Sequence, residues 1–281
     1  MRRIAICADD YAISPAISAG ILEAIDAGRI SATSAMANRP AFVAMMPDLL
    51  NRAPRCDIGL HLNFTLGSPL GSSPQLAPDG RFLPYSTLFR MAILGRIPRD
   101  EIAKEIARQF DRFEEVCGRT PDFVDGHQHV HVLPGIRRLV LAEMTKRNLA
   151  GRAWLRDLSD NPWSIGARRC DRKQAFGLAI LSAGLEQEAA LVGISTNKGF
   201  SGCSRLDPNA DFAQEFGEFL KYPGPRHLVM CHPGRLDSNP LAGDEVTRRR
   251  ECEIKFLLSA HFPRILKERH LMITRMSTIP G

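Results

Sequence analysis

The sequence has few of the features that mark specialised classes of protein. It contains no low-complexity tract and no apolar run approaching the roughly 18–20 residues that a membrane-spanning helix needs. Its basic first residues meet an acidic pair, Asp9-Asp10, too early for the apolar core of a signal peptide. We therefore expect a globular protein located in the cytoplasm.

Cysteine occurs seven times, an odd number, and no two cysteines form a CxxC pair. Neither a disulfide framework nor a cysteine-based zinc site is therefore expected, and we interpret the thiols as free in a reducing compartment. A glycine-rich phosphate-binding fingerprint is also absent after the first predicted strand. Its absence argues against a dinucleotide-binding sheet.

Positive charge is in modest excess, with 37 Lys and Arg against 31 Asp and Glu, which gives a formal net charge of +6. The basic residues are scattered, apart from the run Arg248-Arg249-Arg250, which we interpret as the solvated face of an amphipathic helix. No basic motif with interleaved aromatic residues, as in nucleic-acid-binding proteins, is present. We expect no nucleic-acid partner and no membrane span.

Strand-like and helix-like segments alternate along the whole sequence. The first strand, 3–8, is followed by a helix with Ser14 as N-cap, Pro15 at its first position and Gly28 just beyond its end. Further strands are expected at 30–36, 57–64, 122–134, 152–158, 227–231 and 271–274, and further helices at 41–52, 99–117, 135–148, 171–192, 211–221 and 244–269. Such alternation indicates βα units and a parallel sheet. Seven or so units favour one α/β domain, 1–281, folded as a distorted (β/α) barrel of the TIM-barrel type, over an open doubly wound sheet.

The segment 122–134 carries most of the functional information. As a strand, it would place Asp125, His127, His129 and His131 on one face. Four titratable side chains on one face are costly in a core, because each needs a partner once it is buried. Neutral imidazoles and carboxylates are, however, the usual ligands of catalytic divalent ions. The pattern therefore favours a metal site over a hydrogen-bonded polar cluster under a loop.

Three other segments place polar residues at or just after the ends of predicted strands, where a (β/α) barrel carries its working residues. Asp9-Asp10 follow the first strand, and a cation would relieve the repulsion between these adjacent carboxylates, although Asp is also common in turns. Taken alone, His61 suits a core histidine and His232 suits a strand exit. Together with Asn63, their coincidence at one rim indicates a functional site.

These residues form four motifs that resemble those of the YdjC-like (ChbG/HpnK) carbohydrate deacetylases. The motifs are Ala8-Asp9-Asp10, Gly59-Leu60-His61-Leu62-Asn63, Asp125-Gly126-His127-Gln128-His129-Val130-His131 and Cys231-His232-Pro233-Gly234. They occur in the family's order from residue 3 to about residue 235, and together they are specific. The resemblance implies a distorted (β/α) barrel and metal-dependent hydrolysis of an N-acetyl group on an amino sugar or oligosaccharide.

The resemblance also implies roles for individual residues. Asp10, His61 and His127 match the ligands of one divalent metal ion, Asp9 matches the catalytic base, and His232 matches the general acid. Such a set is chemically coherent, because a metal ion with open positions, a base and an acid together suffice for amide hydrolysis. Two histidines and one aspartate suit Zn²⁺, and Mg²⁺, Mn²⁺ or Co²⁺ would also suit an exposed site of this kind.

Five further residues are assigned to the surroundings of the metal ligands and the substrate. Asp125 is expected to orient a ligand histidine by accepting its second N–H. His129 and His131 are expected to hydrogen bond to a ligand or to the substrate. Asn63 and Tyr11 are expected to lie beside the site, where they would contact the same groups.

One motif departs from the family pattern. After the acidic pair the family usually continues Phe-Gly-Leu-Ser, whereas this sequence has Tyr11-Ala12-Ile13-Ser14. Alanine lacks the easy access of glycine to positive φ at a turn, and the tyrosine adds a hydroxyl near the site. Farther along, Arg152 and Arg156 could contact sugar or a nearby anionic group, or they could be ordinary surface cations, and the sequence leaves this open.

Two other functions fit the same residues. A metal-dependent phosphoesterase could use Asp and His ligands, but such enzymes often hold two metals and need more carboxylates at the rim. A non-catalytic sugar- or metal-binding protein would not need both Asp9 and His232. The expected partner is a small-molecule or oligosaccharide substrate with an N-acetyl group. The sequence specifies neither that substrate nor the metal further, and it leaves a homodimer open.

Overall fold

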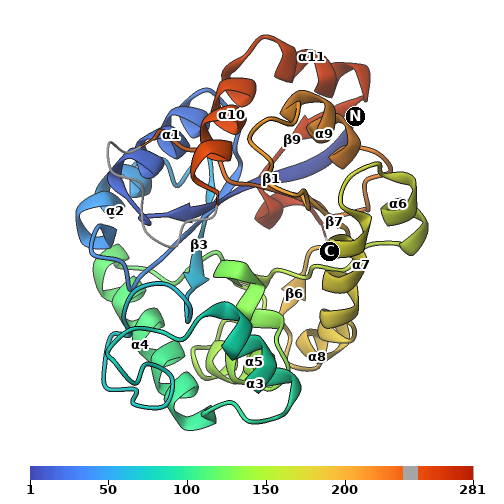
Figure 1. The fold of residues 1–281 in the computed structure, drawn as a ribbon. Coiled ribbons are helices and arrows are strands. Elements are labelled where there is room, and N and C mark those ends of the chain that lie inside the picture. The colour runs from blue at the N-terminus through green and yellow to red at the C-terminus, as the bar shows by residue number, and fades with distance from the viewer. Residues whose placement is uncertain (237–245, 281) are drawn as a thin grey trace.

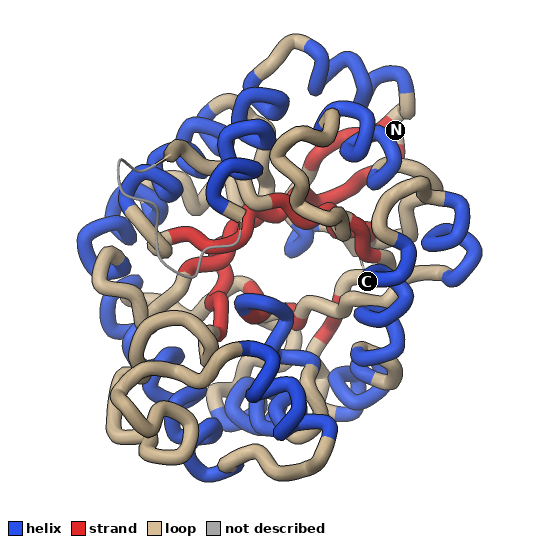
Figure 2. The backbone as a smooth tube through the Cα atoms, in the orientation of Figure 1, coloured by secondary structure: helices blue, strands red, loops and turns tan. Residues whose placement is uncertain are grey.

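The computed structural model describes residues 1–236 and 246–280. Strands form its centre and helices surround them, as Figures 1 and 2 show. The strands are β1 (Arg2–Tyr11), β2 (Ala32–Ala35), β3 (Asp57–Leu62), β4 (Phe123–Gly126), β5 (Trp154–Leu155), β6 (Ser195–Thr196), β7 (Phe200–Ser201), β8 (His227–Cys231) and β9 (Leu271–Ile273). The α-helices are α1 (Pro15–Asp26), α2 (Phe42–Leu50), α3 (Tyr85–Ile93), α4 (Arg99–Cys117), α5 (Ile136–Lys146), α6 (Pro162–Ala167), α7 (Arg172–Leu181), α8 (Leu185–Leu191), α9 (Phe212–Phe219), α10 (Thr247–Leu258) and α11 (His261–Glu268), and the 3₁₀ segments are η1 (His127–Val132) and η2 (Met276–Thr278).

The strands form one curled sheet in which the ladders between them are parallel. The order across the sheet is β6-β5-β4-β3-β2-β1-β8-β7, and β9 pairs with the start of β1. Within the described residues no ladder joins β6 to β7, so the ring of strands is incomplete there. This architecture is the predicted single-domain distorted (β/α) barrel.

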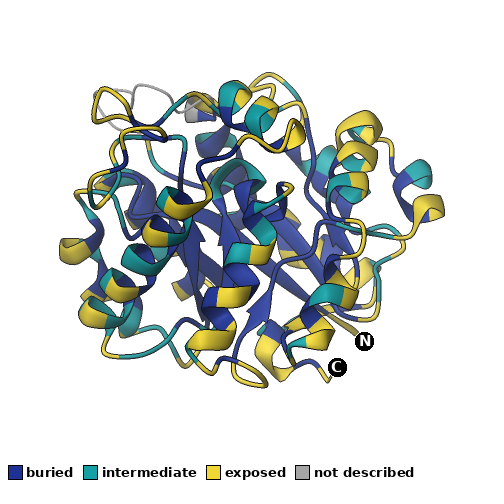
Figure 3. Ribbon diagram, turned by 90° about the horizontal axis from the view of Figure 1, so that it is seen from below, coloured by how far each residue is buried: buried dark blue, intermediate teal, exposed yellow. Residues whose placement is uncertain are grey.

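The residue types explain why the sheet is central and the helices are peripheral. Strands β1, β3 and β8 are rich in Ile, Leu, Val, Ala and Cys and are buried along nearly their whole length, as parallel strands covered by helices are. Helix α4 differs, because Ile102, Ile106, Phe110 and Phe113 form a buried stripe while charged residues cover its other face. Figure 3 shows buried strands inside and exposed residues on the outer helices.

Most predicted elements are present close to their predicted positions. Helix α4 and strand β8 have the predicted bounds, and α1 begins at Pro15, where the Ser14 hydroxyl accepts a hydrogen bond from the Ile17 N–H. Helices α3 and α6 and the two-residue strands β6 and β7 were not predicted. The helix predicted over 244–269 consists of α10 and α11, and residues 244 and 245 lie outside the described residues. No helix in the described ranges is both long and apolar enough to cross a membrane.

The expectation of a solvated face for the three-arginine run is wrong. Arg248 is exposed, but Arg249 and Arg250 are almost fully buried. Arg249 forms an ion pair with Glu253 on the same helix, and Arg250 forms one with Asp10 on β1. A charged helix face that buries ion pairs has the same sequence pattern as a solvated one, so the pattern alone could not separate them.

Candidate functional site

The two adjacent aspartates reach the same rim because β1 is irregular near its end. In a regular strand, neighbouring side chains point to opposite faces. The register between β1 and β2 shifts between Ala8 and Tyr11, and Asp10 has a φ of +71°. Such a bulge re-aims the side chain of Asp10 toward the rim where Asp9 lies. Ala12 also has a positive φ, +68°, so an alanine adopts a conformation that glycine adopts more easily.

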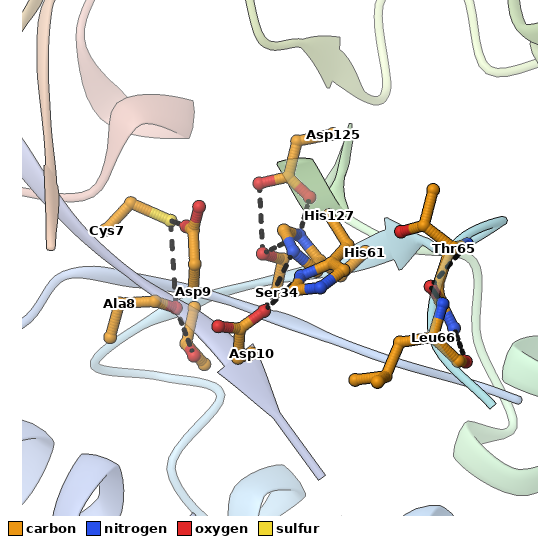
Figure 4. Close-up of polar contacts among 12 residues, drawn as sticks. Cys7, Ala8, Asp9, Asp10, Ser34, His61, Thr65, Leu66, Asp125 and His127 are labelled. Atoms are coloured by element: carbon orange, nitrogen blue, oxygen red, sulfur yellow. Dashed lines mark hydrogen bonds and ion pairs between the residues drawn. The ribbon is translucent and has the colours of Figure 1, made fainter. Parts of the chain in front are cut away.

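Asp10, His61 and His127 come together at this rim from β1, β3 and the turn after β4. Asp10 Oδ1 lies 3.2 Å from His61 Nε2 and 2.9 Å from His127 Nδ1. One potential ligand atom from each residue lies within 4.8 Å of the other two, and Figure 4 shows the three side chains close together. One carboxylate and two imidazoles are a donor set that divalent transition metals accept. The structure therefore groups the three residues predicted as metal ligands.

His61 is held by a carboxylate on its far side, as Figure 4 shows. Its Nδ1 lies 2.7 Å from Asp125 Oδ1 and 2.9 Å from Ser34 Oγ, and the Ser34 hydroxyl donates to Asp125 Oδ2 at 2.9 Å. Burial disfavours the charged form, but the charge of Asp125 and hydrogen bonding to Asp10 outweigh it and raise the pKa of His61 to about 10. The Nε2 proton faces Asp10, where a divalent ion would take over the positive charge. Asp125 thus has the geometry of a group that orients a ligand histidine.

Asp9 lies on the other side of the rim and is held by Arg156. Both carboxylate oxygens of Asp9 accept from the guanidinium, at 2.6 Å from Nη1 and 2.6 Å from Nη2. The same guanidinium lies 2.6 Å from Asp125 Oδ2 and 3.0 Å from Cys7 Sγ. Burial alone would raise the pKa of Asp9, but the charge and hydrogen bonds of Arg156 hold it well below its ordinary range. Arg156 is therefore a fully buried partner of the site, whereas Arg152 is exposed.

The histidine segment is not the strand that the sequence predicts. Strand β4 ends at Gly126, and the 3₁₀ turns of η1 begin at His127. A Cβ at Gly126 would lie 2.9 Å from the Val130 side chain, which explains why a glycine occupies this fold-back. Gln128 and His129 have positive φ values of 50° and 61°. The alternation of side chains between two faces is therefore lost after Asp125.

The three histidines of this segment consequently have different environments. His127 joins Asp10, whereas His131 is fully buried and its Nε2 donates to the Arg156 carbonyl at 3.0 Å. His129 lines the pocket. Burial, reinforced by the charge of Arg156, lowers the pKa of both His129 and His131 to about 3, so both rings are neutral at physiological pH. His131 thus holds the backbone of Arg156, and of these two histidines only His129 lines the pocket.

One pocket of about 310 Å³ opens onto these groups. Its walls include all five residues predicted as base, acid and metal ligands, namely Asp9, Asp10, His61, His127 and His232. The other wall residues are Tyr85, Gln128, His129, Gln174, Leu178, Gly202, Cys203, Ser204, Leu206, Met230 and Val246. This mixture of polar and apolar side chains around a few titratable groups is typical of a small-molecule site.

Tyr11 and Asn63, which the sequence places beside the site, do not line the pocket. The Tyr11 hydroxyl donates to the carbonyl oxygen of Met45 in α2 at 2.7 Å. Asn63 is fully buried, and its side-chain oxygen accepts from the backbone N–H groups of Thr65 and Leu66, which fixes the turn after β3. Neither residue makes the contact expected for it, because a bulge and a turn redirect side chains that the strand pattern places at the rim.

Sequence reasoning also missed a second buried arginine. Arg250 Nη2 lies 2.6 Å from Asp10 Oδ2. Burial would raise the pKa of Asp10, but the charges of Arg250 and His127 hold it well below its ordinary value. Arg250 is far from Asp10 in the sequence, so no local motif could have signalled the contact.

The chain matches the family model described as YdjC-like protein over residues 3–268. It belongs to the YdjC-like family. Among its curated relatives, the chitooligosaccharide deacetylase of Klebsiella pneumoniae (strain 342) is 31% identical over 265 residues, which are 92% of each chain. The chitooligosaccharide deacetylase of Escherichia fergusonii is 29% identical over 277 residues, which are 95% of each chain.

Solved structures confirm the fold of this YdjC-like chain. A protein of Enterococcus faecalis V583, described as a candidate cellobiose-phosphate cleavage protein, has a TM-score of 0.72 at 22% identity over 100% of this chain and 99% of its own. A peptidoglycan N-acetylglucosamine deacetylase has a TM-score of 0.51 at 11% identity, over 99% of this chain and 87% of its own. At these identities the likeness concerns the fold alone.

Proposed function

We propose that this YdjC-like protein is a metal-dependent N-deacetylase of an amino sugar or an N-acetylated oligosaccharide. The observation that carries the proposal is the convergence of Asp9, Asp10, His61, His127 and His232 on one pocket. Membership of the family and the two chitooligosaccharide deacetylases among its relatives support the same chemistry.

Asp10, His61 and His127 would hold one divalent ion. They fit such an ion because one potential ligand atom from each residue lies within 4.8 Å of the other two, and because a bound ion could replace the proton between His61 Nε2 and Asp10 Oδ1, which lie 3.2 Å apart. When bound, the ion would supply Lewis acidity toward the acetyl carbonyl and toward the attacking water. Zn²⁺ and Mg²⁺ are both compatible with this donor set.

Asp9 and His232 would move the two protons of the reaction. Asp9 is ionised and, in this proposal, accepts a proton from the water that attacks the acetyl carbon. Its lowered pKa makes it a weak base, so the reaction needs a water molecule that is already acidified. His232 donates a proton to the amine nitrogen as the C–N bond breaks. The products are acetate and a free amino sugar.

The buried guanidinium of Arg156 speaks against the alternative of a two-metal phosphoesterase. A second group of potential ligands exists, formed by Cys7, Asp9 and Asp125. Arg156 Nη2 already lies within 3.0 Å of an atom of each of these residues. The guanidinium therefore occupies the place that a second cation would take.

Acetate release from di-N-acetylchitobiose and a small panel of N-acetyl sugars tests the proposal. Each reaction is run with added divalent metal, with a chelator, and with Asp9→Asn as the matched control variant. We expect release that requires metal and is lost in Asp9→Asn. Release from no sugar, by protein shown to bind one metal per chain, would contradict the proposal. Release of phosphate from p-nitrophenyl phosphate would instead support the phosphoesterase.

A further inference from the structure

One carboxylate oxygen of Asp10, Oδ2, is bound by an arginine of the same protein. Arg250, on α10, places Nη2 at 2.6 Å from Asp10 Oδ2, and both side chains are almost fully buried. The other oxygen, Oδ1, is the one that His61 and His127 share. The two oxygens of this carboxylate thus have different neighbours, a fixed cation on one side and two imidazoles on the other.

The backbone around Arg250 is anchored independently of the carboxylate. The Arg250 carbonyl oxygen accepts from the Gly234 N–H at 3.2 Å. One turn farther along α10, Glu253 accepts from the His232 N–H at 2.5 Å and pairs with Arg249 at 3.3 Å. Helix α10 is therefore tied to the loop after β8, and this anchoring keeps the guanidinium beside Asp10.

We infer that Arg250 is a positioning residue that sets both the charge and the number of oxygen ligands at the metal site. This inference rests on the proposed role of Asp10 as a metal ligand. The Arg250 cation would repel a divalent ion bound by Asp10, because charges interact more strongly in buried surroundings than in water. By occupying Oδ2, it would also leave Asp10 with one oxygen to offer to the ion. Ions that prefer several oxygen ligands, such as Mn²⁺, are therefore disfavoured relative to Zn²⁺.

The test is metal affinity, measured on the full-length, metal-free protein by competition with a fluorescent chelator. The variants are Arg250→Met and, as matched control, Arg248→Met, which removes an exposed arginine from the same helix. We expect the Kd for Zn²⁺ to fall roughly tenfold in Arg250→Met, because a like charge is removed. The Kd for Mn²⁺ is expected to fall further, because Asp10 can then offer both oxygens. Arg248→Met should bind both ions like the wild type.

A second pair of variants keeps the test decisive if Arg250→Met does not fold. Arg250→Lys retains the charge and should keep the wild-type Kd for Zn²⁺ within about threefold, whereas the neutral Arg250→Gln should tighten binding. A Kd that is unchanged or higher in the folded neutral variants would overturn the inference and leave Arg250 as a brace for Asp10. A wild type that binds neither ion, or binds equally well after His127→Ala, would instead refute the metal site and the proposed function.

Discussion

Asp9 and Asp10 are neighbours in sequence and are almost equally buried at one rim, yet their carboxylates have different partners. Asp9 presents both oxygens to a single guanidinium, that of Arg156. Asp10 divides its oxygens between Arg250 and two imidazoles. The acidic pair is therefore two sites rather than one anionic patch, because each carboxylate has its own cation. Only the Asp10 side includes histidines whose protons a metal ion could replace.

The two sides are joined by one further carboxylate. Asp125 Oδ1 lies 2.7 Å from His61 Nδ1 on the Asp10 side, and Asp125 Oδ2 lies 2.6 Å from Arg156 on the Asp9 side. A displacement of Asp125 would therefore disturb the orientation of His61 and the position of Arg156 together. Changes on either side are expected to be separable only when Asp125 is left in place.

The largest effects are expected from the two aspartates themselves, and they should differ in kind. Asp9→Asn and Asp10→Asn should each lower the kcat/KM of acetate release by about a thousandfold, as loss of an acid–base group or a metal ligand does. Metal binding should separate them, since Asp9→Asn retains the wild-type Kd and Asp10→Asn does not. Chelator competition measures this Kd. Equal loss of metal in both variants would show that the carboxylates form a single site after all.

Loss of the cation on the Asp9 side should cost the most stability. Arg156→Met leaves the carboxylates of Asp9 and Asp125 buried without their common partner, and it should lower the free energy of unfolding by about 3–5 kcal/mol. Urea denaturation followed by circular dichroism measures the change. The exposed Arg152 provides the control, because Arg152→Met should change the free energy of unfolding by no more than about 0.5 kcal/mol. Equal effects would mean that the buried ion pairs contribute nothing specific.

Much of the fold could be predicted because its signals are local. The buried stripe of α4, the cap at Ser14 and the apolar run of β8 each depend on residues within a few positions of one another. The two-residue strands β6 and β7 carry no such signal, since an alternating pattern needs more residues than they contain. Their pairing is decided by neighbouring strands in the sheet.

The candidate site likewise has features that the sequence could predict and features that it could not. Its ligand types could be predicted, because Asp and His at strand ends are visible in the sequence. The geometry of these ligands could not be predicted. It depends on positive φ values at Asp10, Gln128 and His129, and residues other than glycine rarely adopt such backbone conformations. The partners of Arg156 and Arg250 could not be assigned either, because their ion pairs with Asp9 and Asp10 join segments far apart in the chain.

A smaller effect, the pH dependence of the free energy of unfolding, should distinguish the Asp10 side from the Asp9 side. The pKa of His61 is raised to about 10. The protonated His61 therefore stabilises the metal-free folded protein fully below pH 6.5, and this stabilisation is lost as the pH rises toward 10. The pKa values of His129 and His131 are lowered to about 3, so the unfolded chain binds more protons and stability is lost as the pH falls from 6.5 toward 3. Each limb has a slope of up to about 1.4 kcal/mol per pH unit per histidine.

Urea denaturation in the presence of a chelator, from pH 4.5 to 8.5, should therefore show a maximum of stability near pH 6.5. His131→Gln should lower the slope of the acidic limb, to which His129 still contributes, and should leave the alkaline limb unchanged, because His131 belongs to the Arg156 side. An acidic limb with the wild-type slope in this variant would show that protonation of other groups controls it.

The smallest effect is expected at Tyr11, which follows Asp10 in the sequence but turns away from the pocket. Tyr11→Phe removes the hydroxyl that donates to the Met45 carbonyl, and it should lower the free energy of unfolding by about 1 kcal/mol. The kcat, the KM and the metal Kd should stay at wild-type values, because Tyr11 is not among the wall residues of the pocket. A change in KM without a change in stability would place the hydroxyl against the substrate. The bulge would then direct three successive side chains, those of Asp9, Asp10 and Tyr11, toward the site, and Tyr11 would have to be included in the comparison of Asp9 with Asp10.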